Sequence, residues 1–347
     1  MLANETRKCV INSDTPQPRR PRMSDIVHAN LEPATGRGAA TGHHGELLQG
    51  LFLGDEGRLL PGLVTLPLGS LRSTATFTPT ATGSVDTLDT SMEKAARAAI
   101  LTLHFLQRHE LGGTVDIHSN IPRGRGLGSS TADVVATIRA VHDSLRVSSP
   151  PSQIAALAVQ AEVAADSTMF DRPVLFAQRH GRMLEAFQGR LPTAFLIGFD
   201  TADPATTTPT LDLKPIEYST FEVQQFAVLR AALRHAFRQG DADLLGTIAT
   251  ASTRIHLRHR SNPVLEALLP QVETLGACGL QVSHSGTISG LLYPLAARAN
   301  PEVTERATRA LWSAGATATW GCSVGGFSHA KHPQGRQECP ISRTFPS

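Results

Sequence analysis

The amino-acid sequence predicts a folded protein of mixed α and β structure, either one large two-part molecule or two modest domains. Its 347 residues exceed the usual size of one compact domain. Hydrophobic residues make up 41% of the chain and charged residues 18%, far from the composition of a disordered protein. Short alternating or apolar runs, typical of strands, are interleaved with runs in which apolar residues recur at helical spacing.

The two ends of the chain lack this periodic hydrophobicity. Residues 1–35 carry a cluster of prolines and arginines, and we expect a mobile tail. Residues 329–347 are similarly polar and rich in proline, and we expect a loose tail there. The two predicted parts of the folded region are 36–185 and 186–328.

The first part contains one strand and one helix that the pattern predicts directly. Residues 114–118 alternate between polar and apolar side chains, as in a half-buried strand. A helix that starts near Ser130 follows, because four apolar residues recur at helical spacing and form one buried stripe. These residues are Val134, Ile138, Val141 and Leu145.

The second part is predicted to open with a buried strand. The apolar run 194–199 has the length and composition of such a strand. A second helical stripe follows, and Gly240 is placed where a helix would stop. The stripe consists of Phe226, Leu229, Leu233 and Phe237.

The last predicted elements are a pair of strands and a helix. Residues 279–284 and 288–293 are predicted to be strands, joined by a tight turn at Ser285 and Gly286. A helix is predicted over 301–313.

Charge and cysteine usage exclude several functional classes. Lys plus Arg (32) nearly balance Asp plus Glu (30), which predicts no nucleic-acid partner and no membrane surface partner. No apolar run approaches the roughly 18 residues that a membrane span requires, and no secretory signal is visible. The four cysteines are scattered, without the spacing of a zinc site or a disulfide framework. A cytoplasmic protein is therefore expected.

A glycine-rich run gives the strongest functional signal. It follows a strand and enters a helix, and its three glycines allow positive φ angles and close approach to a ligand. Free N–H groups and the helix dipole favour an anion at such a helix start. The predicted phosphate-binding residues are Gly124, Arg125, Gly126, Leu127, Gly128, Ser129, Ser130 and Thr131.

The same run could instead be a helix cap, another phosphate-binding motif or a plain connection. Ser130 and Asp133 have the spacing of a capping box that would fix the helix start. The run is not a Walker A loop, because G-x-x-x-x-G-K-S/T is absent, and the third glycine of a Rossmann fingerprint would fall at Ser129. An ordinary glycine-rich connection remains the alternative without a ligand.

Three segments in this order resemble the motifs of the GHMP kinases. Residues 122–132 are similar to the central motif P-x-x-x-G-L-G-S-S-A-A and differ from it only at Thr131. Residues 42–50 resemble the first motif of this superfamily, and residues 279–290 resemble the third.

Within the superfamily the chain most resembles the L-threonine kinases of cobalamin side-chain synthesis. Their patterns G-E-L-x-Q-G, S-S-T-A-D, D-S-T-x-F and H-S-G are matched at 45–50, 129–133, 166–170 and 284–286. Those enzymes usually have Pro and Cys in the first motif, where this chain has Thr, Gly, His and His at 41–44.

The resemblance implies an α+β fold with the two-part GHMP kinase architecture. Residues 36–185 would form an ATP-binding part like ribosomal protein S5 domain 2, and 186–328 a ferredoxin-like part. It also implies transfer of the γ-phosphoryl of ATP to a small alcohol, with Mg²⁺, by a monomer or homodimer. L-threonine is the expected substrate. Homoserine, an amino alcohol, a sugar or a specialised-metabolite intermediate remain alternatives, as does a nucleotide or metabolite sensor without catalysis.

The resemblance assigns roles to two acidic residues. Glu162 would hold Mg²⁺ together with Ser130, and Asp166 would act as base on the substrate hydroxyl. Mg²⁺ prefers a few protein oxygens beside phosphate and water, and a positioned carboxylate can accept a proton. At i and i+4 the two acids are predicted to share one helix face. An ordinary acidic turn is the alternative, and Asp166 could instead orient the hydroxyl.

The remaining candidates lie in the first motif, the glycine-rich run and the third motif. Arg125 would pair with phosphate oxygens, although solvation on the loop is an alternative. Glu46 would contact substrate or support a turn, and the paired histidines lack the spacing of metal ligands. The predicted substrate-binding residues are His43, His44, Glu46, Ser285 and Gly286.

Overall fold

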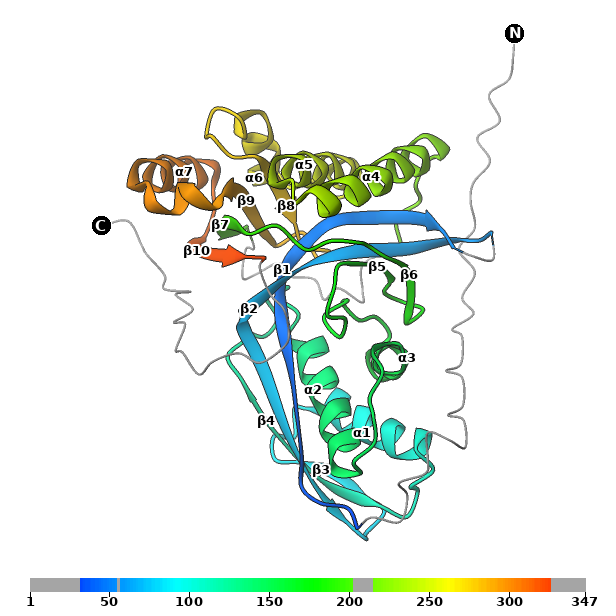
Figure 1. Cartoon of the computed structure of the whole chain (residues 1–347). Helices are drawn as coiled ribbons and strands as arrows, with labels where there is room; N and C mark the ends of the chain where they lie inside the picture. The colour runs from blue at the N-terminus through cyan, green and yellow to red at the C-terminus, as the bar shows by residue number, and fades with distance from the viewer. Residues whose placement is uncertain (1–31, 55–56, 202–214, 326–347) are drawn as a thin grey trace.

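The computed structural model describes residues 32–54, 57–201 and 215–325 (Figure 1). The two predicted tails lie outside the described residues, except for positions 32–35. The strands are β1 (Gly36–Leu53), β2 (Leu59–Thr80), β3 (Val85–Thr87), β4 (Gly112–Ser119), β5 (Val174–Ala177), β6 (Arg182–Ala186), β7 (Ala194–Asp200), β8 (Gly279–Val282), β9 (Ile288–Pro294) and β10 (Ala318–Val324). The helices are α1 (Glu93–Phe105), α2 (Ser129–Ser144), α3 (Pro151–Glu162), α4 (Thr220–Gln239), α5 (Ala242–His259), α6 (Pro263–Leu268) and α7 (Pro301–Ala314), with the 3-10 turns η3 (Leu269–Gln271) and η4 (Leu295–Ala299).

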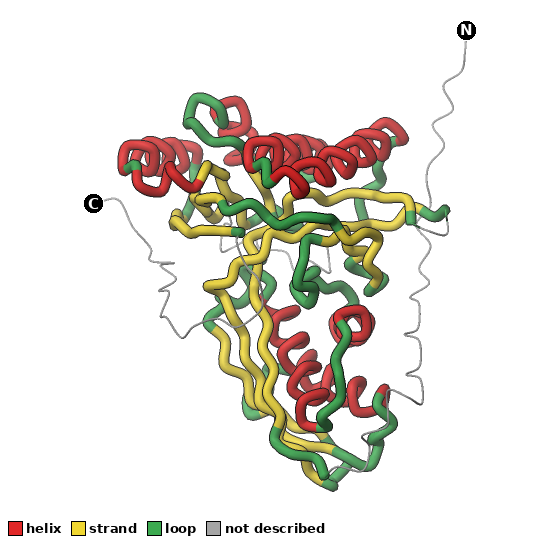
Figure 2. The backbone as a smooth tube through the Cα atoms, in the orientation of Figure 1, coloured by secondary structure: helices red, strands yellow, loops and turns green. Residues whose placement is uncertain are grey.

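All of these strands join one ten-stranded sheet. Its main path runs β10-β7-β9-β8-β1-β2-β4-β3, and β5 pairs with β2 and β6. Helices α1, α2 and α3 lie beside the lower part of the sheet in Figure 1, and α4 to α7 lie above its upper part. Figure 2 shows the same division into a lower and an upper body, with strands crossing between them. The predicted α+β fold is confirmed.

The long hairpin of β1 and β2 connects the two bodies. Irregularities in the β1–β2 register fall at Thr41/Gly42, His43/Glu46 and Glu46/Leu48, within the first motif. Such bulges bend a strand and redirect its side chains. The suggestion that Glu46 supports a turn is wrong, because Glu46 lies inside β1 and pairs with Val282 of β8.

The predicted elements of the first part are confirmed, but the capping box is wrong. The predicted strand lies in β4, and the stripe on α2 is fully buried. Helix α2 begins at Ser129 after Gly128, and no side chain caps it. Ser130 and Asp133 are used elsewhere: Ser130 donates to Glu162, and Asp133 accepts from Ser73.

The upper body has two cores because its sheet is buried on both faces. Along β7, Ala194 and Leu196 face one core, whereas Phe195, Ile197 and Phe199 face the other. This explains the continuous apolar run in the sequence. Helix α4 ends at Gly240 as predicted, and β8, β9 and α7 also match their predictions. Over the described ranges, no helix is long and apolar enough to cross a membrane.

The predicted division at residue 185 falls inside β6. Strands β1 and β2 belong to the first part by sequence, but β1 also contacts α4 and α5 of the second part, and β2 contacts β10. The division into 36–185 and 186–328 therefore stays a prediction.

Candidate active site

The glycine-rich loop lies against the first and third motifs. Gly124, Gly126 and Gly128 all have positive φ angles, of 68°, 73° and 75°. A Cβ atom on Gly128 would lie 2.3 Å from His43 Cδ2 and 3.2 Å from Asp166 Oδ2. A Cβ atom on Gly126 would lie 2.8 Å from the Ser285 hydroxyl. Only glycine fits these two positions, and the three motifs therefore meet at this loop.

Ser130 and Glu162 lie together beside the loop. The Ser130 hydroxyl donates to Glu162 Oε2 at 2.7 Å, and the Thr131 hydroxyl donates to Oε1 at 2.7 Å. Glu162 is the last residue of α3 and is only 3% exposed. Burial raises the pKa of Glu162 to about 7, against the two hydroxyl hydrogen bonds.

This pair fits a magnesium ion. A serine hydroxyl and a carboxylate oxygen are hard oxygen ligands, and Mg²⁺ takes few of these beside phosphate oxygens and water. Lys94, near the start of α1, lies with its Nζ 3.2 Å from the Ser130 hydroxyl. Sequence reasoning missed Lys94, because only the fold brings α1 to the start of α2.

Asp166 is held by a loop and not by a helix. The prediction that Glu162 and Asp166 share a helix face is wrong, since α3 ends at Glu162 and Val163 has a φ of 73°. Positive φ is rare for a β-branched residue and turns the chain sharply here. The Asp166 N–H donates to the Thr131 hydroxyl at 3.3 Å. Thr131, where the chain departs from the general motif, therefore joins Glu162 to Asp166.

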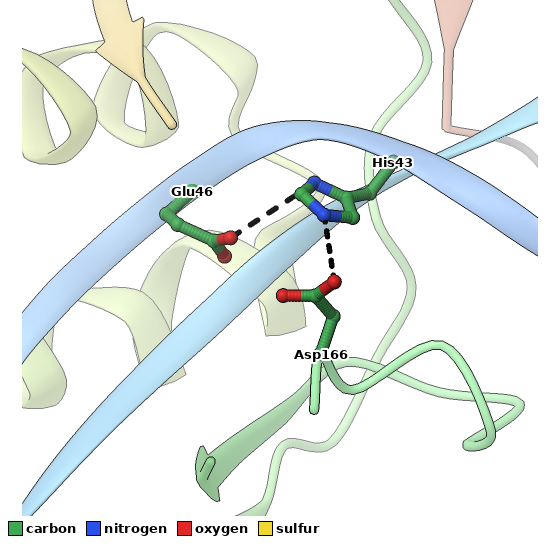
Figure 3. Close-up of side chains that lie close together, drawn as sticks. All are labelled: His43, Glu46 and Asp166. Carbon is green, nitrogen blue, oxygen red and sulfur yellow. Dashed lines mark hydrogen bonds and ion pairs between the residues drawn. The ribbon is translucent and has the colours of Figure 1, made fainter. Parts of the chain in front are cut away.

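Buried His43 forms a pair with the partly buried Asp166 (Figure 3). His43 Nε2 lies 2.9 Å from Asp166 Oδ2, and the Gly45 N–H donates to His43 Nδ1 at 3.0 Å. The ring therefore carries its proton on Nε2 and donates it to the carboxylate. Burial acts to raise the pKa of Asp166, but His43 outweighs it and holds this pKa below its ordinary value.

Two effects oppose each other on the charge of His43. Burial acts to lower its pKa, but Asp166 outweighs burial and raises the pKa to about 9. A second ring proton would lie on Nδ1, where the Gly45 N–H already points. The observed hydrogen bonds therefore correspond to the singly protonated ring.

Glu46 is more deeply buried than Asp166, the other carboxyl group near His43. It is 1% exposed, and neither of its oxygens has a hydrogen-bond partner of good geometry among the described residues. Its Oε1 lies 3.9 Å from His43 Nδ1, and the Thr65 hydroxyl acts to lower its pKa. Burial raises its pKa to about 8, so Glu46 is largely protonated at neutral pH. His43, Glu46 and Asp166 place possible metal-ligand atoms within 4.8 Å of one another. However, Nε2 carries the ring proton and Nδ1 accepts from Gly45, so His43 has no lone pair for a metal.

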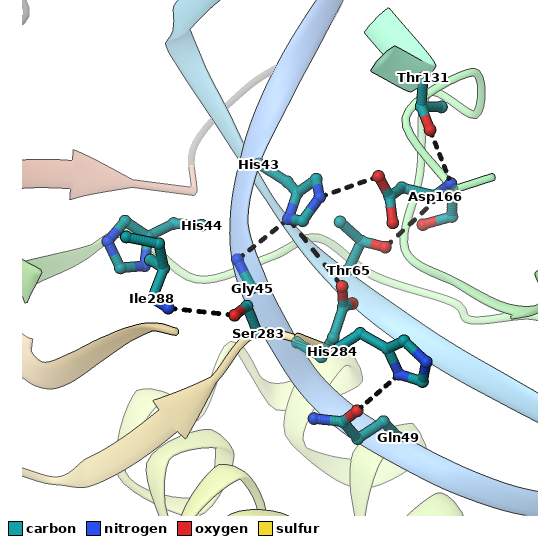
Figure 4. A network of polar contacts seen from close by, with 12 residues as sticks. His43, His44, Gly45, Gln49, Thr65, Thr131, Asp166, Ser283, His284 and Ile288 are labelled. Carbon is teal, nitrogen blue, oxygen red and sulfur yellow. Dashed lines mark hydrogen bonds and ion pairs between the residues drawn. The ribbon is translucent and has the colours of Figure 1, made fainter. Parts of the chain in front are cut away.

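Two predicted residues are not brought to this pair. His44 lies on the opposite side of β1 from His43 (Figure 4). Its Nδ1 lies 2.6 Å from Gln281 Nε2, its ring lies 5.5 Å from that of Trp320, and burial lowers its pKa to about 3. Arg125 forms an ion pair with the buried carboxylate of Asp200 at the end of β7. Arg125 is therefore paired with an acid and not merely solvated on the loop, and its contact with phosphate stays a prediction.

The third motif joins the first through a histidine that the site prediction omitted. His284 Nδ1 lies 3.0 Å from Gln49 Oε1 (Figure 4), and burial lowers the pKa of His284 to about 4. Its neutral ring donates from Nδ1 to Gln49. Ser285 lies against Gly126, and Gly286 has a φ of 82° in the same turn. Gln49 and His284 were within the recognised motifs, so their position in those motifs was the available signal.

Comparison with known proteins gives consistent similarities. The sequence-family model named GHMP kinases N terminal domain matches residues 93–177, which include the glycine-rich loop, Glu162 and Asp166. The L-threonine kinase of Salmonella typhimurium strain LT2 is 29% identical over 187 residues, which cover 51% of this chain and 59% of that enzyme. The L-threonine kinase of Citrobacter freundii is 29% identical over 253 residues, which cover 72% of this chain and 83% of that enzyme.

A solved structure supports the fold. The homoserine kinase from Cytophaga hutchinsonii aligns with a TM-score of 0.60 and 14% identity, over 85% of this chain and 96% of that chain. At this identity the likeness concerns the fold alone.

Proposed function

We propose that this chain, a member of the GHMP kinase superfamily that resembles the L-threonine kinases, transfers the γ-phosphoryl group of ATP to the hydroxyl of L-threonine. One observation carries this proposal. Thr131 links the Ser130–Glu162 pair to Asp166. A pair that would hold Mg²⁺ and a carboxylate that would face the substrate hydroxyl therefore lie beside the glycine-rich loop.

The phosphate loop would bind the nucleotide. Its positive-φ glycines and the start of α2 present N–H groups to the ATP phosphates. Ser130 and Glu162 would hold Mg²⁺, which when bound neutralises negative charge on the phosphate oxygens. Lys94 lies close enough to Ser130 to add a positive charge at the same point.

Asp166 would receive the substrate hydroxyl. The alcohol oxygen forms a bond to the γ-phosphorus, the bond from that phosphorus to the β–γ bridging oxygen breaks, and the hydroxyl proton passes to Asp166. The lowered pKa keeps Asp166 ionised but makes it a weak base, which favours orientation of the hydroxyl and late proton transfer. His43 positions this carboxylate through its Nε2–H.

Side chains of the first motif should decide which alcohol the protein phosphorylates. Glu46 offers a buried, protonated carboxyl group beside His43 that could donate a hydrogen bond to the substrate. The histidine at position 43 lies against Asp166, where the first motif departs from the pattern of L-threonine kinases. That departure keeps homoserine or another small alcohol as the second candidate. A sensor without catalysis is disfavoured by the retention of Ser130, Glu162 and Asp166 together.

An ADP-release assay with purified protein, ATP and Mg²⁺ tests the proposal. We expect turnover with L-threonine above that with L-serine, because one methyl group supplies about 1 to 3 kcal/mol of discrimination. Homoserine, amino alcohols and sugars form the comparison set. If another alcohol exceeds threonine by roughly a hundredfold in kcat/KM, the threonine assignment is wrong and the kinase assignment stands. Absence of turnover with every alcohol would favour the sensor.

A further inference from the structure

A cavity of about 1230 Å³ lies beside the candidate active site. Residues of β1 and β2, the segment 167–173 and the segment 186–191 line it. The Ser167 N–H donates to the Thr65 hydroxyl at 3.3 Å, and both residues line the cavity. Ser167 directly follows Asp166, and Thr65 pairs with Glu46 across the hairpin. His43, Glu46 and Asp166 are not among the lining residues, so Thr65 and Ser167 form a wall between the two sites.

The lining of this cavity is strongly basic. Arg72, Arg139, Arg172 and Arg190 line it. Asp171 is the one acid among the described lining residues, and it lies 3.4 Å from Arg172. Four positive groups against one negative group leave an excess of three positive charges. A concave surface with one sign of charge concentrates ligands of the opposite sign.

Arg139 is the most informative of the four arginines. It is partly buried on α2, and its guanidinium donates to two neutral acceptors, Ala39 O at 2.6 Å and Met169 O at 3.0 Å. These bonds tie the 167–173 segment to β1, but they do not neutralise the charge. Burial and the nearby Arg72 both lower the pKa of Arg139. Among the described residues, Arg139 has only these carbonyl partners. A half-buried cation that no acid neutralises is costly, unless an anion completes the site.

The cavity also has hydroxyl groups without partners. Thr168 is 4% exposed, and its Oγ1 has no hydrogen-bond partner among the described residues. The hydroxyl of Thr41 also has no hydrogen-bond partner among the described residues. Both threonines line the cavity. Buried hydroxyls normally find partners, so each of these two would gain one if its side chain turned toward a bound ligand.

We propose that this cavity binds a small anion carrying phosphate or carboxylate groups, held by Arg139 and Arg72 with the Thr168 hydroxyl. The guanidinium fork matches both groups through paired charge-assisted hydrogen bonds. The bound anion contacts the segment that follows Asp166, and it therefore stabilises the position of that carboxylate. This site is separate from the phosphate loop and does not depend on which alcohol is phosphorylated.

Calorimetric titration of the full chain with inorganic phosphate and, separately, with succinate tests this site. Each titration is run without nucleotide and with a saturating non-hydrolysable ATP analogue and Mg²⁺, which would fill the phosphate loop. We expect at least one probe to bind in both conditions; binding of phosphate alone or of succinate alone identifies the preferred group. Arg72→Gln and Thr168→Val should each weaken this binding by roughly tenfold, the loss of one hydrogen bond to a charged group.

Arg309→Gln is the matched control, because Arg309 is exposed on α7 and does not line the cavity. It should bind the probe as the wild type does. Arg139→Gln should lose binding entirely, but it also removes two structural bonds, so Arg72→Gln carries the decision. The proposal is overturned if neither probe binds the wild type, or if Arg72→Gln and Arg309→Gln bind equally.

Discussion

The two sides of the candidate site use different physical means. The loop side, Gly124 to Thr131 with Glu162, works through backbone conformation and a helix start, and its Ser130 and Thr131 hydroxyls both donate to Glu162. The strand side, His43 and Glu46 with Asp166, works through buried or partly buried side chains whose charges depend on one another. Nucleotide binding should therefore be lost when the conformation of the loop changes. Turnover should change when a residue of the strand side gains or loses a proton.

Substitution of a loop glycine should have the largest effect. A side chain at Gly128 would collide with His43 and Asp166, whereas Gly124 has a similar φ with nothing within 4 Å of a Cβ position. Gly128→Val should abolish detectable binding of an ATP analogue and lower the free energy of unfolding by about 1 to 3 kcal/mol. Gly124→Asn should change both little, because asparagine tolerates this conformation. Calorimetry and urea unfolding of both variants measure the contrast. Equal nucleotide binding by the two variants would contradict the role given to Gly128.

Loss of the hydrogen bond between His43 and Asp166 should have the next largest effect on activity. In His43→Gln, Asp166 loses its ring donor, so kcat should fall by about tenfold to a hundredfold through poorer positioning. Because His43 holds the pKa of Asp166 down, the acid limb of the pH–rate profile should move to higher pH.

His44→Gln is the matched control for the adjacent histidine. His44 is buried on the other side of β1, so this change should lower stability without moving the profile. An unmoved acid limb in His43→Gln would remove His43 from the positioning of Asp166.

The contrast between these sides also explains what the sequence could predict. The loop is one continuous run that follows a predicted strand, so both its place and its positive-φ glycines were predictable. His43 and Asp166 are 123 residues apart, and only the fold brings them together. The bulges of β1 break the alternation of polar and apolar residues by which a strand is recognised.

Two local rules failed because tertiary contacts replaced them. The capping box would need the Ser130 hydroxyl, which Glu162 takes instead. The shared helix face of Glu162 and Asp166 would need α3 to continue, but the chain turns at Val163. In both cases the predicted local structure was wrong, whereas the functional roles of these residues stay predictions.

The pH dependence of magnesium binding should be a moderate effect. Burial raises the pKa of Glu162 to about 7, so protons compete with Mg²⁺ below that pH. Apparent Mg²⁺ affinity should fall by about tenfold between pH 8 and pH 6, and Glu162→Gln should bind weakly at both. Titration of Mg²⁺ into the complex with an ATP analogue at each pH measures this. Identical affinities of wild type at both pH values would exclude Glu162 as a ligand.

The same shift predicts a stability trend. A carboxyl group whose pKa is raised by folding contributes stability that is fully present below its unfolded value of 4.5. That contribution is lost as the pH rises to about 7. Without Mg²⁺, the difference in free energy of unfolding between wild type and Glu162→Gln should therefore move against the wild type over this range. A constant difference in urea unfolding would show that the pKa is not raised.

Removal of the Thr131 hydroxyl, which links the two sides, should have the smallest effect on kcat. Thr131→Val removes the hydroxyl that donates to Glu162 and accepts from the Asp166 N–H, at a cost of about 1 to 3 kcal/mol in stability. We expect a few-fold loss in kcat, because both acids keep their other contacts. Thr131→Ser retains the hydroxyl and should behave like the wild type in the ADP-release assay. If serine and valine are equally impaired, the methyl group and not the hydroxyl matters.

Asp166→Asn, measured for turnover and for nucleotide affinity on one purified sample, tests most directly that the two sides have separate tasks. The amide preserves the volume of the side chain but cannot accept a proton as the carboxylate does. We expect kcat to fall by roughly 10²- to 10⁴-fold while affinity for the ATP analogue stays unchanged. Unchanged turnover, or a parallel loss of nucleotide binding, would contradict this separation of tasks.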